Sequence, residues 1–291
     1  MNFRSGRIFC SLALTILLAA CASGKSTDTL PSSPVPAFNV AAITTPPTGP
    51  AEPRAYAAMV VDAKSGKVLF EQDSEELRYP ASLTKMMTLF LVFEDVKAGK
   101  LSFNTPLRVS RNAASRPPSK IGVKAGSTIL VRDAVRALAV KSANDVAAVI
   151  AENLAGSEEA FARRMTRTAQ ALGMTKTRFV NASGLPDQRQ VSTARDMAIL
   201  GRALKLRHPR YSRYFSARDF TYNGRRYRAT NKLLGTVRGV DGIKTGYIRL
   251  SGFNLVASVN RGNKHLLVVV FGGKTGRSRD AHVTELIERY L

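Results

Sequence analysis

An apolar helix in the first third of the chain is the feature that most limits how this protein can fold. Residues 86–93 are hydrophobic at all positions but one, so nearly every face of the predicted helix is apolar. Such a helix is stable in water only when other elements surround it. We therefore expect it at the centre of a globular domain. The apolar content of 44% fits such a domain and argues against a disordered or polytopic membrane protein.

Strands are predicted at both ends of the domain. Residues 56–62 and 67–71 flank the turn Lys64-Ser65-Gly66 and predict a β-hairpin. Close to the C-terminus the pattern predicts three consecutive strands, at 242–248, 253–260 and 265–272. A sheet built from both chain ends is the simplest arrangement that pairs these strands.

Helices dominate the middle of the chain. The hydrophobic period predicts them at 131–154, at 158–172, from Thr193 to about 206 and, at the end of the chain, over about 279–290. A hairpin with the turn Asn223-Gly224 interrupts them at 220–229. We therefore expect an α+β fold: an antiparallel sheet flanked by helices, with a mostly helical inserted subdomain and the active site between the two.

The N-terminus has the features of an export signal. Arg4 and Arg7 precede an apolar stretch at 8–20 that is too short to span a bilayer comfortably. The next residues, Leu18-Ala19-Ala20-Cys21, resemble the lipobox of bacterial lipoproteins, in which Cys21 would be lipidated and become the mature N-terminus. Ordinary cleavage after Ala20-Cys21-Ala22 is the alternative. Both readings predict export, which argues against nucleic acid as a partner.

Three regions follow from this pattern. Residues 1–21 form the signal, and residues 22–53 are rich in Pro, Ser, Thr and Ala and predict a disordered tether. The folded domain then covers 54–291. The chain carries 44 basic and 21 acidic residues, a net charge of 44 − 21 = +23, and nearly all of the excess lies in this domain. On an exported protein, such a charge predicts attraction to an anionic wall polymer or membrane surface.

Several common catalytic arrangements are absent from the sequence. We find no G-x-S-x-G, H-E-x-x-H or phosphate-binding glycine motif, and two cysteines cannot build a four-thiolate zinc site. The three histidines, His208, His265 and His282, are scattered near predicted turns and element ends, so we expect them at the surface. We therefore expect neither a Ser-His-Asp mechanism nor a metal or other cofactor.

The pair Ser82-x-x-Lys85 is the strongest candidate for chemistry. A spacing of three places both side chains on one helix face, just before the apolar helix. The positive end of the helix dipole and the nearby core both disfavour a charged lysine. Lys85 can therefore act as a base toward the Ser82 hydroxyl. The alternative is a capping serine beside a solvated lysine.

Two further short patterns supply partners, and context selects among their copies. S-x-N occurs four times, and we select Ser142-Ala143-Asn144 because it lies at a break between two apolar helices. K-T-G occurs twice, and we select Lys244-Thr245-Gly246 because it lies on a predicted strand. Gly246 would let a substrate backbone approach closely.

The order of these three motifs resembles the penicillin-binding proteins and serine β-lactamases, in particular the low-molecular-weight D-alanyl-D-alanine carboxypeptidases. The resemblance runs from about residue 54 to the end and includes the stretches 79–86, 142–145, 156–161, 192–197, 241–246 and 254–258. It implies a β-lactamase/transpeptidase-like fold. It also implies removal of the terminal D-Ala from peptidoglycan stem pentapeptides, and β-lactam antibiotics as covalent inhibitors.

The resemblance also implies roles for individual residues. Ser82 would be the nucleophile, Lys85 its base, and Ser142 a proton relay to the leaving amine. The substrate-binding residues would be Asn144, Lys244, Thr245, Gly246, Tyr247, Arg279 and Arg195. Among these, the backbone N–H groups of Ser82 and Tyr247 would form the oxyanion hole. For Arg279 and Arg195, a surface salt bridge is the alternative.

The sequence departs from the family pattern in two respects. Tyr247 stands where relatives often carry histidine, which leaves the deacylation rate open. We also expect neither the C-terminal β domain nor the amphipathic helix of many relatives, so a lipid on Cys21 would anchor the protein to the membrane. The alternative functions are a D,D-endopeptidase, a serine β-lactamase and a non-catalytic basic wall-binding module. No E-x-x-L-N segment of class A β-lactamases lies between Ser142 and Lys244.

Overall fold

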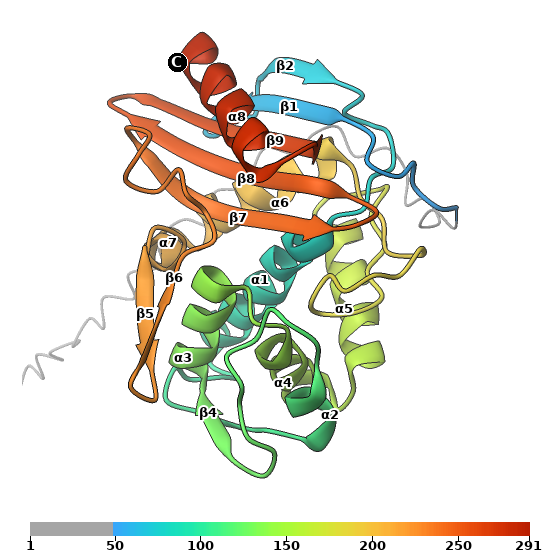
Figure 1. Ribbon diagram of the computed structural model, residues 1–291, viewed down its shortest axis with the longest axis vertical. Helices are drawn as coiled ribbons and strands as arrows, with labels where there is room; N and C mark the ends of the chain where they lie inside the picture. Colours follow the sequence, from blue (N-terminus) through green and yellow to red (C-terminus); the bar gives the residue numbers. More distant parts are fainter. Residues whose placement is uncertain (1–48) are drawn as a thin grey trace, which may run out of the picture. The chain divides into compact units, whose positions relative to one another are not determined.

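The computed structural model describes residues 49–291, so the predicted signal, Cys21 and most of the predicted tether lie outside the described residues. Both ends of the described chain contribute to one antiparallel sheet, with the strand order β2-β1-β9-β8-β7 (Figure 1). Its strands are β1 (Ala57–Asp62), β2 (Val68–Gln72), β7 (Val240–Ile248), β8 (Gly252–Arg261) and β9 (Lys264–Gly273). The predicted α+β class and sheet are confirmed.

Alternation along the central strand β9 divides the core into two layers. Leu267, Val269 and Phe271 face a cluster that includes α6 (Ala194–Arg207). Their neighbours Leu266, Val268 and Val270 face α8 (Gly276–Tyr290) on the other side of the sheet. Side chains two residues apart on a strand share a face, so this run of apolar residues makes β9 hydrophobic on both faces.

The apolar helix lies in the interior, as predicted. It forms α1 (Lys85–Lys97), which follows the short 3₁₀ turn η1 (Ala81–Thr84), and residues 86–93 are all buried. The other helical elements are α2 (Arg111–Ser115), α3 (Val131–Arg136), η2 (Ala137–Lys141), α4 (Asn144–Ala155), α5 (Glu158–Ala171), η3 (Pro209–Tyr211) and α7 (Ser212–Phe215). Two small hairpins, β3 (Pro106–Arg108) with β4 (Thr128–Leu130) and β5 (Asp219–Tyr222) with β6 (Arg225–Arg228), complete the fold.

The structure corrects three predictions. The helical segment expected over 131–154 contains the π-helical turn η2, which was not expected, whereas the break at Ser142, with a φ of 62° that cannot continue a helix, is where the S-x-N motif led us to expect one. The last helix begins at Gly276, because Thr275 of the second K-T-G copy accepts a hydrogen bond from the Ser278 N–H and caps it. His208 is buried between Phe90 and Tyr211 rather than exposed, and this burial lowers its pKa to about 4.

Within residues 49–291, no helix is both long and apolar enough to cross a membrane.

Candidate active site

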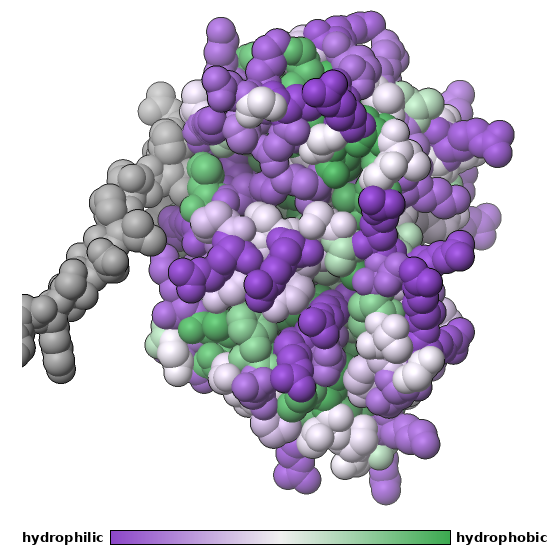
Figure 2. All heavy atoms as spheres, turned by 90° about the vertical axis from the view of Figure 1, so that its left-hand side faces the viewer, coloured by the Kyte–Doolittle hydropathy of each residue, from purple (hydrophilic) through white to green (hydrophobic). Residues whose placement is uncertain are grey.

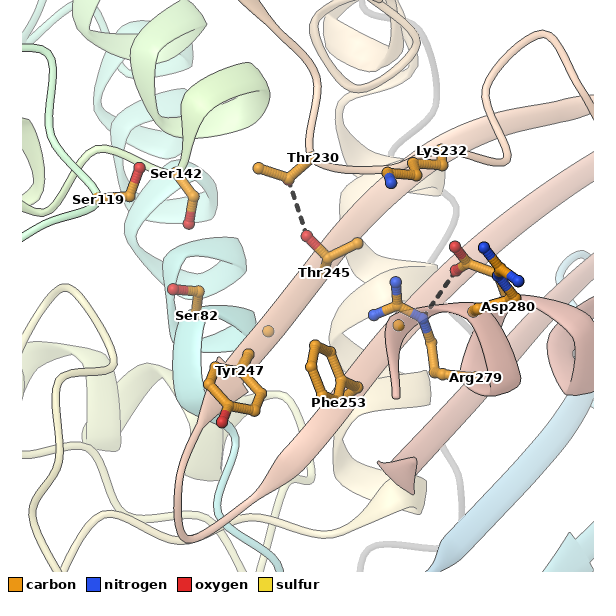
Figure 3. Close-up of a pocket in the computed structure, with 13 residues that line it drawn as sticks. Ser82, Ser119, Ser142, Thr230, Lys232, Thr245, Tyr247, Phe253, Arg279 and Asp280 are labelled. Carbon is orange, nitrogen blue, oxygen red and sulfur yellow. Dashed lines mark hydrogen bonds and ion pairs between the residues drawn. The ribbon is translucent and has the colours of Figure 1, made fainter. Parts of the chain in front are cut away.

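A cavity of about 480 Å³ opens beside the edge strand β7 (Figure 3). Six of the residues singled out from the sequence line it: Ser82, Ser142, Thr245, Gly246, Tyr247 and Arg279. They come from η1, the break between η2 and α4, β7, and the first turn of α8. Lys85, Asn144 and Lys244 are buried behind this lining. The structure therefore assembles the three sequence motifs in one place.

The lysine of the first motif contacts the serine directly. Lys85 Nζ lies 3.1 Å from Ser82 Oγ and 2.8 Å from Asn144 Oδ1, to which it donates. It also donates to the backbone carbonyl of Ser183. A neutral amine has two N–H groups and one lone pair. The two carbonyl oxygens can accept the two N–H groups, which leaves the lone pair for the Ser82 hydroxyl proton.

The surroundings of Lys85 favour its neutral form. Complete burial lowers the pKa of Lys85 well below its usual range, and the positive charge of Lys244 lowers it further. The carboxylates of Asp145 and Glu158 act in the opposite direction, but more weakly. Desolvation penalises the charged amine because the protein interior solvates an ion poorly. Lys85 is therefore suited to accept a proton from Ser82 near neutral pH.

The second motif contributes a hydroxyl and an amide. Ser142 adopts a left-handed conformation, and its buried Oγ has no hydrogen-bond partner among the described residues. Asn144 is held at three points: its backbone N–H donates to Ser119 O at 2.6 Å, its Nδ2 donates to Pro117 O at 3.0 Å, and its Oδ1 accepts from Lys85. Asn144 is therefore fixed in one orientation, whereas the Ser142 hydroxyl is available to a ligand in the cavity.

The third motif lies on β7. Lys244 is buried and donates from Nζ to the backbone carbonyl of Thr245 at 2.9 Å. Burial lowers the pKa of Lys244 to about 7, and the nearby Arg279 contributes to this shift. The Thr245 hydroxyl lies in the cavity and donates to the Thr230 hydroxyl at 2.8 Å (Figure 3). Two cations and a hydroxyl thus lie close together, which is the chemistry that recognises a carboxylate.

Two glycines allow the backbone of η1 to lie close to its neighbours. A Cβ on Gly246 would lie 2.9 Å from the Pro80 carbonyl oxygen and 3.2 Å from the Ser82 nitrogen. A Cβ on Gly184, which has a φ of +82°, would lie only 1.9 Å from the Ala81 carbonyl oxygen. Glycine is therefore required at both positions for Ser82 to lie between β7 and the segment that contains Ser183.

The two arginines singled out from the sequence have different surroundings. Arg279 is buried and lines the cavity, with Nη1 2.6 Å from the Asn254 carbonyl oxygen and Nε 2.8 Å from Asp280 Oδ1. Arg195 does not line the cavity and forms ion pairs with Glu71, at 3.0 Å, and Glu75. Its charge is thus used in a salt-bridge cluster, and we exclude Arg195 from the site.

The sequence reasoning missed other residues of the site. Ser119, Thr230, Lys232, Phe253, Gly276, Arg277 and Asp280 also line the cavity. Phe253 packs against the half-exposed Tyr247, with ring centroids 4.3 Å apart. None of these positions belongs to a selected motif, although Gly276 is the glycine of the second K-T-G copy, which we did not select. Only the pairing of β7 with β8, which places Tyr247 opposite Phe253, could have indicated one of them in advance.

No group of three or more His, Cys, Asp or Glu side chains within 49–291 is arranged to hold a metal ion.

Comparison with known proteins places this geometry in a family. The model of the D-alanyl-D-alanine carboxypeptidase family matches residues 42–275. The D-alanyl-D-alanine carboxypeptidase DacF of Bacillus subtilis is 35% identical over 245 residues, which cover 80% of this chain and 61% of that protein. The chain spans about three fifths of the length of DacF and of the DacA proteins of Escherichia coli.

Solved structures agree with this match. The D-alanyl-D-alanine carboxypeptidase DacD of Francisella tularensis superposes with a TM-score of 0.79 at 29% identity and covers 86% of this chain and 72% of that one. Penicillin-binding protein D2 of Listeria monocytogenes, in its cefotaxime-bound form, superposes with a TM-score of 0.74 at 34% identity and covers 81% of this chain and 96% of that one. This chain belongs to the D-alanyl-D-alanine carboxypeptidase family.

Proposed function

We propose that this protein is a serine D-Ala-D-Ala carboxypeptidase, which removes the terminal D-Ala from peptidoglycan stem pentapeptides through an acyl-enzyme. The observation that carries the proposal is the 3.1 Å contact between Ser82 Oγ and a buried Lys85 whose pKa is well below its usual range. A hydroxyl beside a neutral amine is an activated nucleophile. Membership of the family supplies the reaction class.

In the acylation step, Ser82 Oγ attacks the carbonyl carbon of the penultimate D-Ala while its proton passes to Lys85 Nζ. The carbonyl oxygen becomes an oxyanion, which the backbone N–H groups of Ser82 and Tyr247 stabilise. The peptide C–N bond then breaks, and the leaving amine of D-Ala takes a proton through the Ser142 hydroxyl. The unpaired, buried Ser142 Oγ in the cavity lining supports this relay.

Recognition of the free C-terminus explains why the enzyme would cut only the last residue. The terminal carboxylate of the substrate would lie against Lys244, Thr245 and Arg279. The supporting observations are the cavity position of Thr245 and Arg279 and the buried Lys244 behind them. An anion at this point also compensates the mutual repulsion of the two cations, which is the second cause of the lowered pKa of Lys244.

The proposed site of action is the bacterial cell envelope, after export. An N-terminal lipid on Cys21 would hold the enzyme at a membrane, and the segment 22–53 would provide the reach between anchor and domain. Labelling with a radioactive fatty acid should mark the protein but not its C21A variant. An unlabelled protein cleaved after residue 22 would support ordinary secretion instead.

Two assays test the activity. Fluorescent penicillin should label the protein covalently and fail to label S82A. The control variant S102A, which changes the serine of an S-x-N copy that we did not select, should be labelled normally.

Incubation with pentapeptide muropeptides should release D-Ala and leave tetrapeptides. Cleavage of cross-linked dimers alone would indicate an endopeptidase, and rapid turnover of the penicillin would indicate a β-lactamase. If the protein is not labelled and releases no D-Ala, the acyl-enzyme mechanism is refuted and the wall-binding module is the remaining function.

A further inference from the structure

Exposed basic side chains gather on the β5–β6 hairpin and on the loop that follows it. We call them the basic ridge and define it by five residues: Arg218, Arg226, Arg228, Lys232 and Arg238. All five are exposed. Figure 2 views the molecule from the side of this hairpin and shows a largely hydrophilic surface. None of these five charges takes part in the proposed acylation step or in the proposed binding of the terminal carboxylate, so their position needs another explanation.

The basic ridge leads directly to the cavity. Arg226 and Arg228 are two residues apart on β6, so their side chains share one face of the hairpin. The chain then continues to Thr230 and Lys232, which both line the cavity. At about 3.3 Å per residue in extended chain, Arg228 lies about 7 Å along the chain from Thr230. A polymer bound at Arg226 and Arg228 would therefore need only a short unbound stretch between these arginines and the cavity.

Most of this charge is uncompensated. Within residues 49–291, the only carboxylate paired with the basic ridge is Asp219, which lies 2.6 Å from Arg226. The hydrogen bond from Arg226 lowers the pKa of Asp219, and the charges of Arg228 and Arg218 add to the effect. Five cations and one carboxylate leave a local net charge of 5 − 1 = +4. Such a surface attracts anions over a distance of about 10 Å at moderate salt.

A second cavity, of about 420 Å³, extends the basic ridge away from the active site. Arg218 and Arg238 line it, and no acidic side chain does. Gly235, with a φ of +80°, makes room for one of them, because a Cβ there would lie 2.7 Å from Arg218 Cζ. The Arg218 guanidinium therefore lies against Gly235 at a hollow that an anionic group can enter.

We infer that the basic ridge binds free carboxylates on neighbouring peptide branches of a peptidoglycan strand while one branch occupies the active-site cavity. This inference rests on the proposed carboxypeptidase function and adds that the preferred substrate is the polymer rather than a short peptide. Guanidinium groups bind carboxylates through two parallel hydrogen bonds. The continuity of the ridge with the cavity through Lys232 favours the polymer over a lipid surface, which would not need to meet the reacting centre.

The test compares two substrates and two double variants. R226Q/R228Q removes two charges from the basic ridge at exposed positions where an ion pair contributes little to stability. R163Q/R167Q is the matched control: it removes two exposed charges from α5, which lies on the other side of the molecule (Figure 1). Release of D-Ala is measured from intact sacculi and from a soluble acyl tripeptide that ends in D-Ala-D-Ala.

We expect R226Q/R228Q to digest sacculi about fivefold more slowly at low salt, and to match the unsubstituted enzyme on the tripeptide. The difference should vanish at about 0.5 M salt, where charges are screened within a few Å. R163Q/R167Q should match the unsubstituted enzyme on both substrates. Equal rates of all three proteins on sacculi would overturn the inference.

Two further outcomes are distinct. If R226Q/R228Q digests sacculi normally but no longer binds vesicles of phosphatidylglycerol, the basic ridge binds a membrane and the inference is wrong. If the unsubstituted enzyme hydrolyses neither substrate, the proposed function fails instead. Pelleting with sacculi then still tests the ridge, because loss of binding in R226Q/R228Q would support it and unchanged binding would overturn it.

Discussion

Replacing Gly184 by alanine should damage both the fold and the reaction, because this glycine lies against the backbone of the nucleophile. The new Cβ would lie 1.9 Å from the Ala81 carbonyl oxygen, and contacts of real Cβ atoms begin at about 3.0 Å. The backbone must therefore open by at least 3.0 − 1.9 = 1.1 Å. Ala81 already has a φ of 48°, so a shift there moves Ser82 with it.

The energetic cost has two parts that a second glycine separates. The left-handed backbone costs an alanine about 1 kcal/mol at either position. Gly224 has a φ of +74°, but a Cβ there meets no atom within 4 Å, so G224A pays this cost alone. The clash at Gly184 adds about 1 to 3 kcal/mol of overpacking. We therefore expect G184A to lose about 2 to 4 kcal/mol and G224A about 1 kcal/mol in urea unfolding.

The rate of labelling by fluorescent penicillin gives the second readout. A displacement of about 1 Å at the nucleophile can slow the chemical step about 100-fold. G184A should therefore acylate about 100-fold more slowly under conditions where it is fully folded, whereas G224A should acylate normally. If the two variants have the same stability and the same rate, the close packing of Gly184 against η1 is not what positions Ser82.

Three other predictions concern the charged groups of the site. K244M should stabilise the fold by a few kcal/mol at pH 6, because the pKa of Lys244 falls from 10.5 in the unfolded chain to about 7 in the folded protein. Measured by urea unfolding, this gain in stability should shrink toward pH 10, and no gain at pH 6 would contradict the argument that burial destabilises the charged lysine. In pH profiles, kcat/KM should fall above about pH 7, because Lys244 then loses the proton with which it binds the substrate carboxylate. R279Q should shift this fall to higher pH, because it removes the positive charge that helps to lower the pKa of Lys244, and an unshifted profile would exclude Lys244 as the titrating group. S142A should lower kcat about 100-fold or more while KM changes little, and an unchanged kcat would exclude the relay.

The sequence was sufficient to locate the residues whose chemistry depends on close spacing. Ser82 and Lys85 are three residues apart, so local geometry alone brings them together. The apolar helix after them had to be central because nearly all of its faces are hydrophobic. The strands at the two ends of the domain had to pair with each other because no other predicted strands have a similar length. Selecting Ser142 and Lys244 among repeated motifs depended on their predicted elements, and the structure places both beside Lys85 or the cavity.

Contacts between distant segments could not be predicted in this way. The carbonyl of Ser183 accepts from Lys85, 98 positions away in the sequence, and a backbone carbonyl carries no residue-specific signal. The left-handed conformation of Ser142 was likewise hidden: a break between helices was expected there, but a serine does not indicate a positive φ as a glycine would. The burial of His208 follows from aromatic neighbours on α1 and η3 that only the tertiary fold brings together.

The pairing of β1 with β9 has a consequence for how the protein reaches its native state. Ala57 lies opposite Phe271, so the sheet joins residues that are 271 − 57 = 214 positions apart. β9 is the middle strand, and β1 cannot join β8 and β7 without it. Because contacts of such long range form slowly, a chain that emerges from its N-terminus must keep the β1–β2 hairpin and the apolar α1 soluble until almost the whole sequence is available. Late completion of the sheet would also delay assembly of the site, since Lys244 and Thr245 lie on β7 and only β9 and β8 join that strand to β1.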